Sequence, residues 1–181
     1  GITTIADFRR RDMAASGQGA PLTPAFHNVL FRSEKEDSIV LNLGGIANIT
    51  YLPANLKAPI TGFDTGPANC LLDQWIHYHH KQWFDEDGAW AATANFDPTL
   101  LQQFLSDPYF QLTPPKSTGL EYFNLNWLNT QLNSVDRPLS PAIVQASLCE
   151  LTAISVERAI QQFKSSQGVL VLCGGGSKNT Y

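Results

Sequence analysis

The segment from Gly168 to Asn179 constrains the fold more than any other part of the chain. It reads G-V-L-V-L-C-G-G-G-S-K-N, a near-continuous apolar run followed by three glycines and then by polar residues. Such a run is typical of a buried strand in a parallel sheet. A strand, a glycine turn and residues that can cap a helix together open a β-α unit. The sequence therefore predicts an α/β fold. Because the chain stops at Tyr181, it also predicts an internal fragment of a longer protein.

Further strands are predicted where short apolar runs are bounded by Gly or Pro. S-I-V-L-N-L-G-G and A-N-I-T-Y-L-P are separated by a gap of hairpin size, so they predict an antiparallel pair with Gly44-Gly45 at its tip. The remaining predicted strands are Ile2–Ala6, which is short, and Pro59–Asp64.

Helices are predicted from caps, prolines and apolar periodicity. One follows Asp64, with Pro67 as its first residue and a stripe at Leu71, Leu72, Trp75, Ile76 and His79. Asp97-Pro98 and Ser140-Pro141 each predict a capped helix start, and the second helix is expected to end at Gly168. Segments 16–24 and 111–119 are too rich in Gly and Pro for regular structure.

Composition limits the classes of function that this protein can have. The net charge of -4 gives no electrostatic reason to expect nucleic acid or an anionic membrane as partner. No apolar run approaches the length of a membrane span. The three cysteines lie far apart, which argues against a disulfide framework or a zinc site, and we expect a reducing, cytoplasmic environment. His77, His79 and His80 lack partners at metal-ligand spacing, so no metal site is predicted.

Asp64, in T-G-F-D-T-G-P-A-N, is the leading candidate for chemistry. The predicted elements put it at the carboxyl end of a strand, where open α/β sheets place ligands, and two residues outside the helix that follows. Beside the backbone N–H groups of a glycine turn it is expected to stay ionised. An ionised carboxylate can accept a proton during phosphoryl transfer. The alternative is that Asp64 only makes a turn.

The glycine turns are candidate phosphate or nucleotide contacts, because glycine lets backbone N–H groups approach a phosphate closely. From local sequence alone, Gly44-Gly45 fits a simple tight turn better than a phosphate contact, and neither turn has the P-loop pattern. Three glycines in a row at Gly174–Gly176 exceed what a cap requires. Weaker candidates are Lys116 and Glu121, whose loop charges are usually only solvated, and Arg9–Arg11 with Asp12, which could bind an anion or form surface ion pairs.

Taken together, six motifs in order resemble the anhydro-N-acetylmuramic acid kinases. The motifs are D-F-R-R-R-D with G-Q-G-A-P-L, L-N-L-G-G-I-A-N-I-T, F-D-T-G-P-A-N, D-G-A-W-A, P-K-S-T-G-L-E-Y-F-N and L-C-G-G-G-S-K-N. The resemblance implies an actin-like ATPase (ribonuclease H-like) domain with a mixed central sheet flanked by helices, truncated at both ends. Residues 1–36 would be the end of a first kinase domain and an arm, and residues 37–181 most of the second domain.

The resemblance also implies a reaction. An enzyme of this family hydrolyses the 1,6-anhydro ring of anhydro-N-acetylmuramic acid and phosphorylates the 6-oxygen with ATP and Mg²⁺, in peptidoglycan recycling. Asp64 would be the base that activates water. The implied nucleotide-binding residues are Asn42, Gly44, Gly45, Gly174, Gly175, Gly176 and Asn179, and the implied substrate-binding residues are Arg10, Asp12, Gln18, Lys116 and Glu121.

Two positions depart from the family pattern. Ala68 and Leu120 stand where the family usually has Gly and Arg. The first is tolerable with a negative φ, and the second leaves the role of the Lys116–Glu121 loop open.

Other readings stay open. The phosphate hairpin typical of the family is absent from this sequence, so the 181-residue chain is expected to have little or no turnover. The alternatives are an ATP-independent glycoside hydrolase that uses Asp64 with Glu121, and a non-catalytic sugar-binding subdomain. Exposed faces could also lead two copies to form a homodimer.

Overall fold

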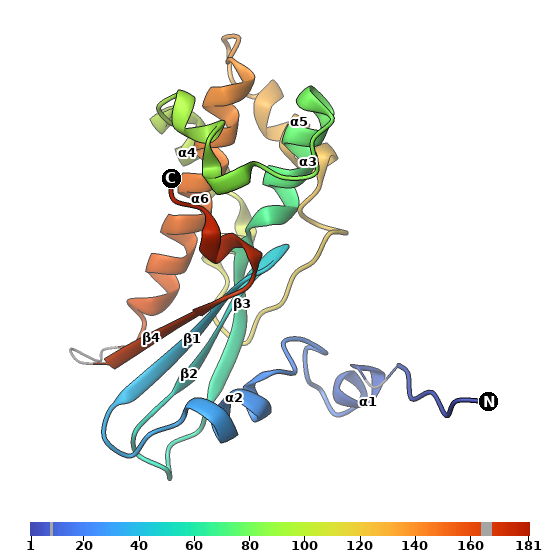
Figure 1. Ribbon diagram of the computed structural model, residues 1–181, viewed down its shortest axis with the longest axis vertical. Coiled ribbons are helices and arrows are strands. Elements are labelled where there is room, and N and C mark those ends of the chain that lie inside the picture. The colour runs from blue at the N-terminus through green and yellow to red at the C-terminus, as the bar shows by residue number, and fades with distance from the viewer. Residues whose placement is uncertain (8, 164–167) are drawn as a thin grey trace.

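A four-stranded mixed sheet forms the centre of the computed structural model, which describes residues 1–7, 9–163 and 168–181 (Figure 1). The strands are β1 (Asp37–Leu43), β2 (Ile46–Leu52), β3 (Thr61–Pro67) and β4 (Gly168–Cys173), in the order β3-β2-β1-β4. β2 pairs antiparallel with both β1 and β3, and β4 runs parallel to β1. The predicted α/β class, the mixed sheet and the hairpin at Gly44-Gly45 are confirmed.

Helices cover both faces of this sheet. The helices are α1 (Arg9–Ala14), α2 (Pro24–Phe31), α3 (Asn69–His80), α4 (Pro98–Leu105), α5 (Leu125–Asn133) and α6 (Pro141–Ile160). α6 packs on one face, where Ile49 and Phe63 are fully buried. α2 lies on the other face, where His27 Nδ1 is 2.9 Å from Thr50 Oγ1. The alternation of Ile49 and Thr50 along β2 separates the two faces.

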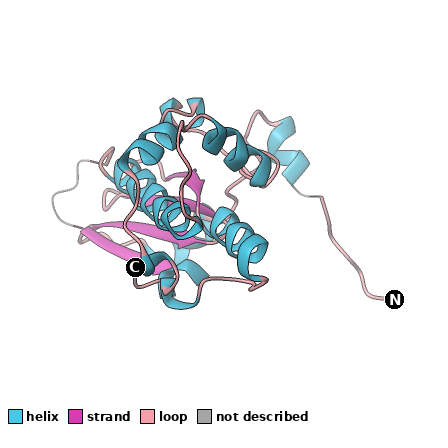
Figure 2. Cartoon of the chain, turned by 90° about the horizontal axis from the view of Figure 1, so that it is seen from above, coloured by secondary structure: helices cyan, strands magenta, loops and turns pink. Residues whose placement is uncertain are grey.

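The larger core lies beyond the end of the sheet at which β1 and β3 finish. There α3, α4, α5 and α6 pack together around Leu71, Phe104, Phe123 and Leu148 (Figures 1 and 2). Residues 1–7 extend away from the rest of the molecule (Figure 2). In the described part of the chain, no helix is long and apolar enough to cross a membrane.

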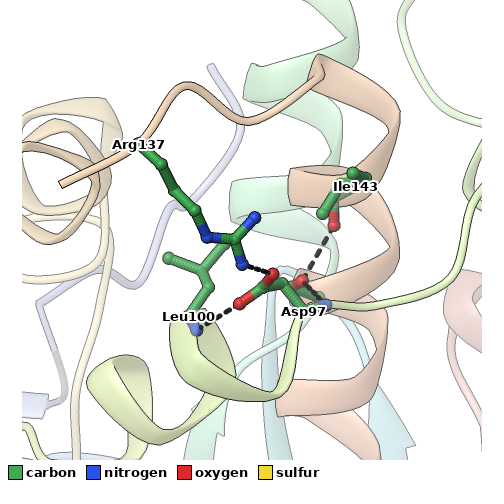
Figure 3. A network of polar contacts seen from close by, with 5 residues as sticks. Asp97, Leu100, Arg137 and Ile143 are labelled. Carbon is green, nitrogen blue, oxygen red and sulfur yellow. Dashed lines mark hydrogen bonds and ion pairs between the residues drawn. The ribbon is translucent and has the colours of Figure 1, made fainter. Parts of the chain in front are cut away.

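The two predicted cap-plus-proline starts are confirmed. Asp97 Oδ1 accepts a hydrogen bond from Leu100 N at 2.9 Å, and Ser140 Oγ accepts one from Ile143 N. Asp97 also pairs with Arg137, and its own N–H donates to a serine hydroxyl on α6 (Figure 3). This network ties the start of α4 to α6, which forms one wall of the core.

Three predictions about the ends of the chain are wrong. No strand forms at Ile2–Ala6, because no described residue pairs with it and its apolar side chains stay exposed. α6 ends at Ile160, well before Gly168, which instead begins β4. β4 itself is an edge strand with Val169, Leu170 and Leu172 about half exposed, so the predicted burial is also wrong for this chain.

Candidate active site

Asp64 lies inside β3 rather than at its end. β3 continues to Pro67, which pairs with Ile46, and the register shifts beside Asp64 through a bulge at Thr65. Bulges re-aim side chains and are common next to active sites. The prediction that Asp64 ends the strand is therefore wrong, since the glycine and proline after it still pair with β2.

The helix after β3 begins at Asn69, not at Pro67, and its N-cap is Ala68. Ala68 and Asn69 donate their backbone N–H groups to the carbonyls of Gly45 and Gly44. The hairpin tip thus holds the start of α3, and neither Asp64 nor Thr65 caps it. Ala68 has a φ of -128°, so the condition of a negative φ that makes alanine tolerable at this position is met.

The Asp64 carboxyl is buried with one backbone donor. Its side chain is 5% exposed, and its Oδ2 accepts a hydrogen bond from Thr118 N at 3.0 Å. Burial raises the pKa of Asp64, while the Thr118 N–H and the charge of Arg9 act to lower it. The sequence predicted that a glycine turn would hold Asp64 in its ionised form. Instead, the hydrogen bond to its carboxylate comes from the loop that contains Thr118. The largest influence on its pKa is desolvation by burial, which raises it.

A cavity of about 440 Å³ opens in front of this carboxyl. Its polar lining comes from segments far apart in the sequence, and the lining includes Arg9, Asn42, Asn48, Asp64 and Thr118. The hydroxyl of Thr118 is buried and has no hydrogen-bond partner among the described residues. The cavity therefore combines a carboxylate, a cation and amides in a space that suits a polar ligand.

The predicted sugar-binding residues of the arm lie elsewhere. Arg10 is exposed and pairs with Asp7 at 3.0 Å, and Asp12 accepts a hydrogen bond from Gly19 N at 2.7 Å. Gln18 is exposed, and none of the predicted three lines the Asp64 cavity. Arg9 lines it instead. The run of three arginines was a visible signal, but only the fold selects which of them faces the cavity.

Lys116 differs from the expected solvated loop charge, whereas Glu121 is exposed as expected. Lys116 is 8% exposed, its Nζ donates to Tyr109 O at 3.3 Å, and it does not line the cavity. Glu121 is exposed, and its charge raises the pKa of Asp64 only as a minor contribution after burial. Leu120, between them, is 61% exposed.

The two predicted glycine turns meet. Gly174 has a φ of +86°, and a Cβ built there would lie 2.6 Å from Leu43 O and 2.7 Å from Asn42 Oδ1. Only glycine permits this approach. The turn after β4 therefore packs directly on Asn42, which also lines the Asp64 cavity. Gly44 and Gly45 have no left-handed φ, so their geometry is that of an ordinary tight turn.

A second cavity has a volume of about 510 Å³. Gly175, Gly176 and Asn179 line it, together with Leu72, Phe84 and a group of charged side chains. The charged lining residues are Asp73, Asp85, Glu86, Asp87 and Lys178. Burial raises the pKa of Asp73 to about 6. Sequence reasoning missed Asp73, because a single acid on a helix carries no motif.

The mixed sheet, with helices on both faces and glycine turns at one end, is the fold of the sugar kinases and actin-like ATPases. Within that class, a family model described as anhydro-N-acetylmuramic acid kinase matches residues 1–181. The chain belongs to the anhydro-N-acetylmuramic acid kinase family.

Curated relatives agree with this assignment. Over 179 residues the chain is 52% identical to an anhydro-N-acetylmuramic acid kinase of Coxiella burnetii (strain RSA 493 / Nine Mile phase I) and 53% identical to one of Xylella fastidiosa (strain Temecula1). Each match covers 99% of this chain but 48% and 46% of the relatives. A relative from Xanthomonas oryzae pv. oryzae is 52% identical, and the match covers 99% of this chain and 46% of the relative. The chain spans about half the length of the curated relatives it matches.

Proposed function

We propose that this chain supplies one wall of the active site of an ATP-dependent anhydro-N-acetylmuramic acid kinase. The enzyme opens the 1,6-anhydro ring with water and phosphorylates the released 6-oxygen, in cytoplasmic peptidoglycan recycling. The observation that carries the proposal is the buried Asp64 carboxyl, which lines a 440 Å³ cavity together with Asn42, the residue on which the glycine turn after β4 packs. Residues 37–181 form most of the second kinase domain in this proposal, and residues 1–36 form the arm that precedes it.

Asp64 is the general base in the proposed reaction. Its carboxylate takes a proton from water, and the oxygen of that water bonds to the anomeric carbon as the bond from that carbon to the 6-oxygen breaks. The 6-oxygen then takes the γ-phosphoryl group of ATP, and ADP leaves. Burial raises the pKa of Asp64. A raised pKa increases the proton affinity of the carboxylate, which suits a base.

Arg9 is the cavity's cation and fits an anionic substituent of the substrate, such as the lactyl carboxylate. The amide of Asn48, opposite Asp64 on β2, can donate to and accept from sugar hydroxyls. This assignment moves the proposed anion contact from Arg10 to its neighbour Arg9, because Arg10 points to Asp7 and solvent.

ATP is proposed to occupy the second cavity. Leu72 and Phe84 offer apolar surface to a base, and Gly175, Gly176 and Asn179 allow close backbone approach. The proposed phosphate contacts are Asn42, which lines the Asp64 cavity, Gly174, which packs on Asn42, and the hairpin glycines Gly44 and Gly45.

Mg²⁺ fits the acidic lining of this cavity. Among the described residues, no three His, Cys, Asp or Glu side chains are arranged to hold a metal by themselves. Mg²⁺ usually binds one or two carboxylates together with substrate phosphates, and Asp73 and Asp87 offer such oxygens. When bound, it neutralises charge on the phosphates.

Two experiments test the proposal. Calorimetric titration of 1,6-anhydro-N-acetylmuramic acid into this chain, with and without Mg-ATP, should show sugar binding that Arg9→Gln weakens and Arg10→Gln does not. In a full-length enzyme that contains this segment, Asp64→Asn should abolish turnover while sugar affinity stays within about tenfold, because the base acts mainly in the transition state.

Two outcomes would contradict the proposal, and each points to a different alternative. Unchanged turnover in Asp64→Asn would remove Asp64 from the chemistry. Opening of the ring without ATP would instead favour a glycoside hydrolase.

The proposed homodimer rests on exposed apolar side chains such as Val169 and Leu172 of β4, and sedimentation of the purified chain tests it.

A further inference from the structure

The outer edge of β3 is covered at Asp64. β3 is an edge strand of the sheet, so its outward N–H and C=O groups have no strand partner. At Asp64 both groups are nevertheless paired. Asp64 N donates to Lys116 O at 3.1 Å, and Asp64 O accepts a hydrogen bond from the Tyr109 hydroxyl at 2.8 Å. The loop that follows α4 therefore replaces a neighbouring strand at the residue that carries the carboxylate.

Asp64, Lys116 and Tyr109 are linked in a closed ring of hydrogen bonds, called here the circuit. Tyr109 and Lys116 each bind Asp64, and Lys116 Nζ donates to Tyr109 O at 3.3 Å. The same ammonium lies 4.6 Å from the centroid of the Tyr109 ring. Two residues further on, Thr118 N donates to the Asp64 carboxylate. The backbone and the side chain of Asp64 are thus held by one short segment of chain.

Tyr109 is itself rigidly held. Its ring packs edge-on against Phe123 with centroids 5.4 Å apart, and its N–H donates to Asp107 Oδ1 at 2.9 Å. Burial, and secondarily the charge of Asp64, raise the pKa of Tyr109 above its ordinary value. The phenol therefore stays protonated and remains a donor throughout the physiological pH range.

We propose that Tyr109 and Lys116 are positioning residues that fix the Asp64 carboxylate toward the cavity, and that neither contacts substrate. The assignment of a catalytic purpose to this circuit rests on the proposed function of Asp64. It gives Lys116 a different role from the substrate contact that the family resemblance implied. Its ammonium is buried against Tyr109 and does not line the cavity.

The test uses two variants that break the circuit at different bonds. Tyr109→Phe removes the hydroxyl but keeps the ring against Phe123, and Lys116→Met removes the ammonium but keeps the buried aliphatic stem. Tyr122→Phe is the matched control, since the Tyr122 hydroxyl donates to Asp107 Oδ1 at 2.8 Å in the same loop and does not touch Asp64.

Two readouts on the purified chain follow Asp64 directly. Hydrogen exchange of the Asp64 amide should accelerate about tenfold in both circuit variants, because each variant removes one buried hydrogen bond that holds the loop whose Lys116 carbonyl accepts from that amide. The Asp64 carboxyl resonance, followed by NMR through a pH titration, should show a pKa that falls toward the ordinary value as the freed carboxylate gains water. Arg9 and Glu121, the charged groups that act on Asp64, are unchanged in all variants.

Either circuit variant that leaves both readouts at the wild-type values overturns the proposal. So does Tyr122→Phe, if it changes them as much as Tyr109→Phe. Neither readout needs sugar or ATP. A failure here is therefore distinguishable from a failure of the proposed kinase function, which the turnover of Asp64→Asn tests separately.

Discussion

Gly174→Ala tests whether the contact between the two glycine turns is a packing requirement. The φ of +86° at Gly174 costs an L-residue about 1–2 kcal/mol. The added Cβ would also lie 2.6 Å from Leu43 O, a backbone atom that cannot rotate away. Relieving such an overlap by shifting the backbone costs about 1–3 kcal/mol. We therefore expect the free energy of unfolding to fall by about 2–5 kcal/mol, the sum of these two costs.

Gly175→Ala is the matched control. A Cβ there meets nothing within 4 Å and no left-handed φ is required, so we expect a change below about 0.5 kcal/mol. Urea unfolding measures both variants. Because β4 is an exposed edge strand, part of the strain can be released by detaching β4 from β1, and this would appear as faster amide exchange at Val169 to Cys173. The reasoning is refuted if Gly174→Ala matches Gly175→Ala in both unfolding and exchange.

Two further variants probe the core that holds the site. Asp97→Asn should lower the free energy of unfolding by about 1 kcal/mol at pH 7, because it weakens the charged cap and the pair with half-exposed Arg137. The backbone N–H of Leu100 lowers the pKa of Asp97 in the folded state, so this difference should be full above pH 3.8 and vanish as pH falls through the folded pKa, as acid titration of stability would show. Leu148→Ala, at a residue 1% exposed, should cost about 2–5 kcal/mol in urea unfolding, and Leu120→Ala, at a residue 61% exposed, should cost almost nothing.

Local sequence signals predicted the elements that depend on local chemistry. The Gly44-Gly45 hairpin and the Asp97 cap were found because turn and cap preferences act over a few residues. The β3 boundary was wrong because glycine and proline normally break a strand, whereas here Pro67 pairs with Ile46 at the edge of the sheet.

The rest of the site depends on tertiary contacts that no short pattern encodes. Lys116 is a loop lysine and was expected to be solvated, yet the Tyr109 ring and carbonyl bury it. The choice of Arg9 over Arg10 follows from the direction of α1, which places one arginine against the cavity and the other beside Asp7. Family resemblance supplied Asp64, but the loop that holds it could be identified only from the fold.

The burial of Asp64 argues for function because it is costly to the fold. Asp64 does not cap a helix, and among the described residues no ion pair compensates its charge. Burial raises the folded-state pKa of Asp64 above the ordinary value of 3.8, so its contribution to stability is full below pH 3.8 and is lost as pH rises through the folded pKa. Asp64→Asn does not titrate and escapes this loss, so it should raise the free energy of unfolding at pH 7 and change it little at pH 3. Thermal unfolding at the two pH values measures this. A variant less stable than the wild type at pH 7 would mean that the carboxylate supports the fold, and the case for retaining it for chemistry would then rest on turnover alone.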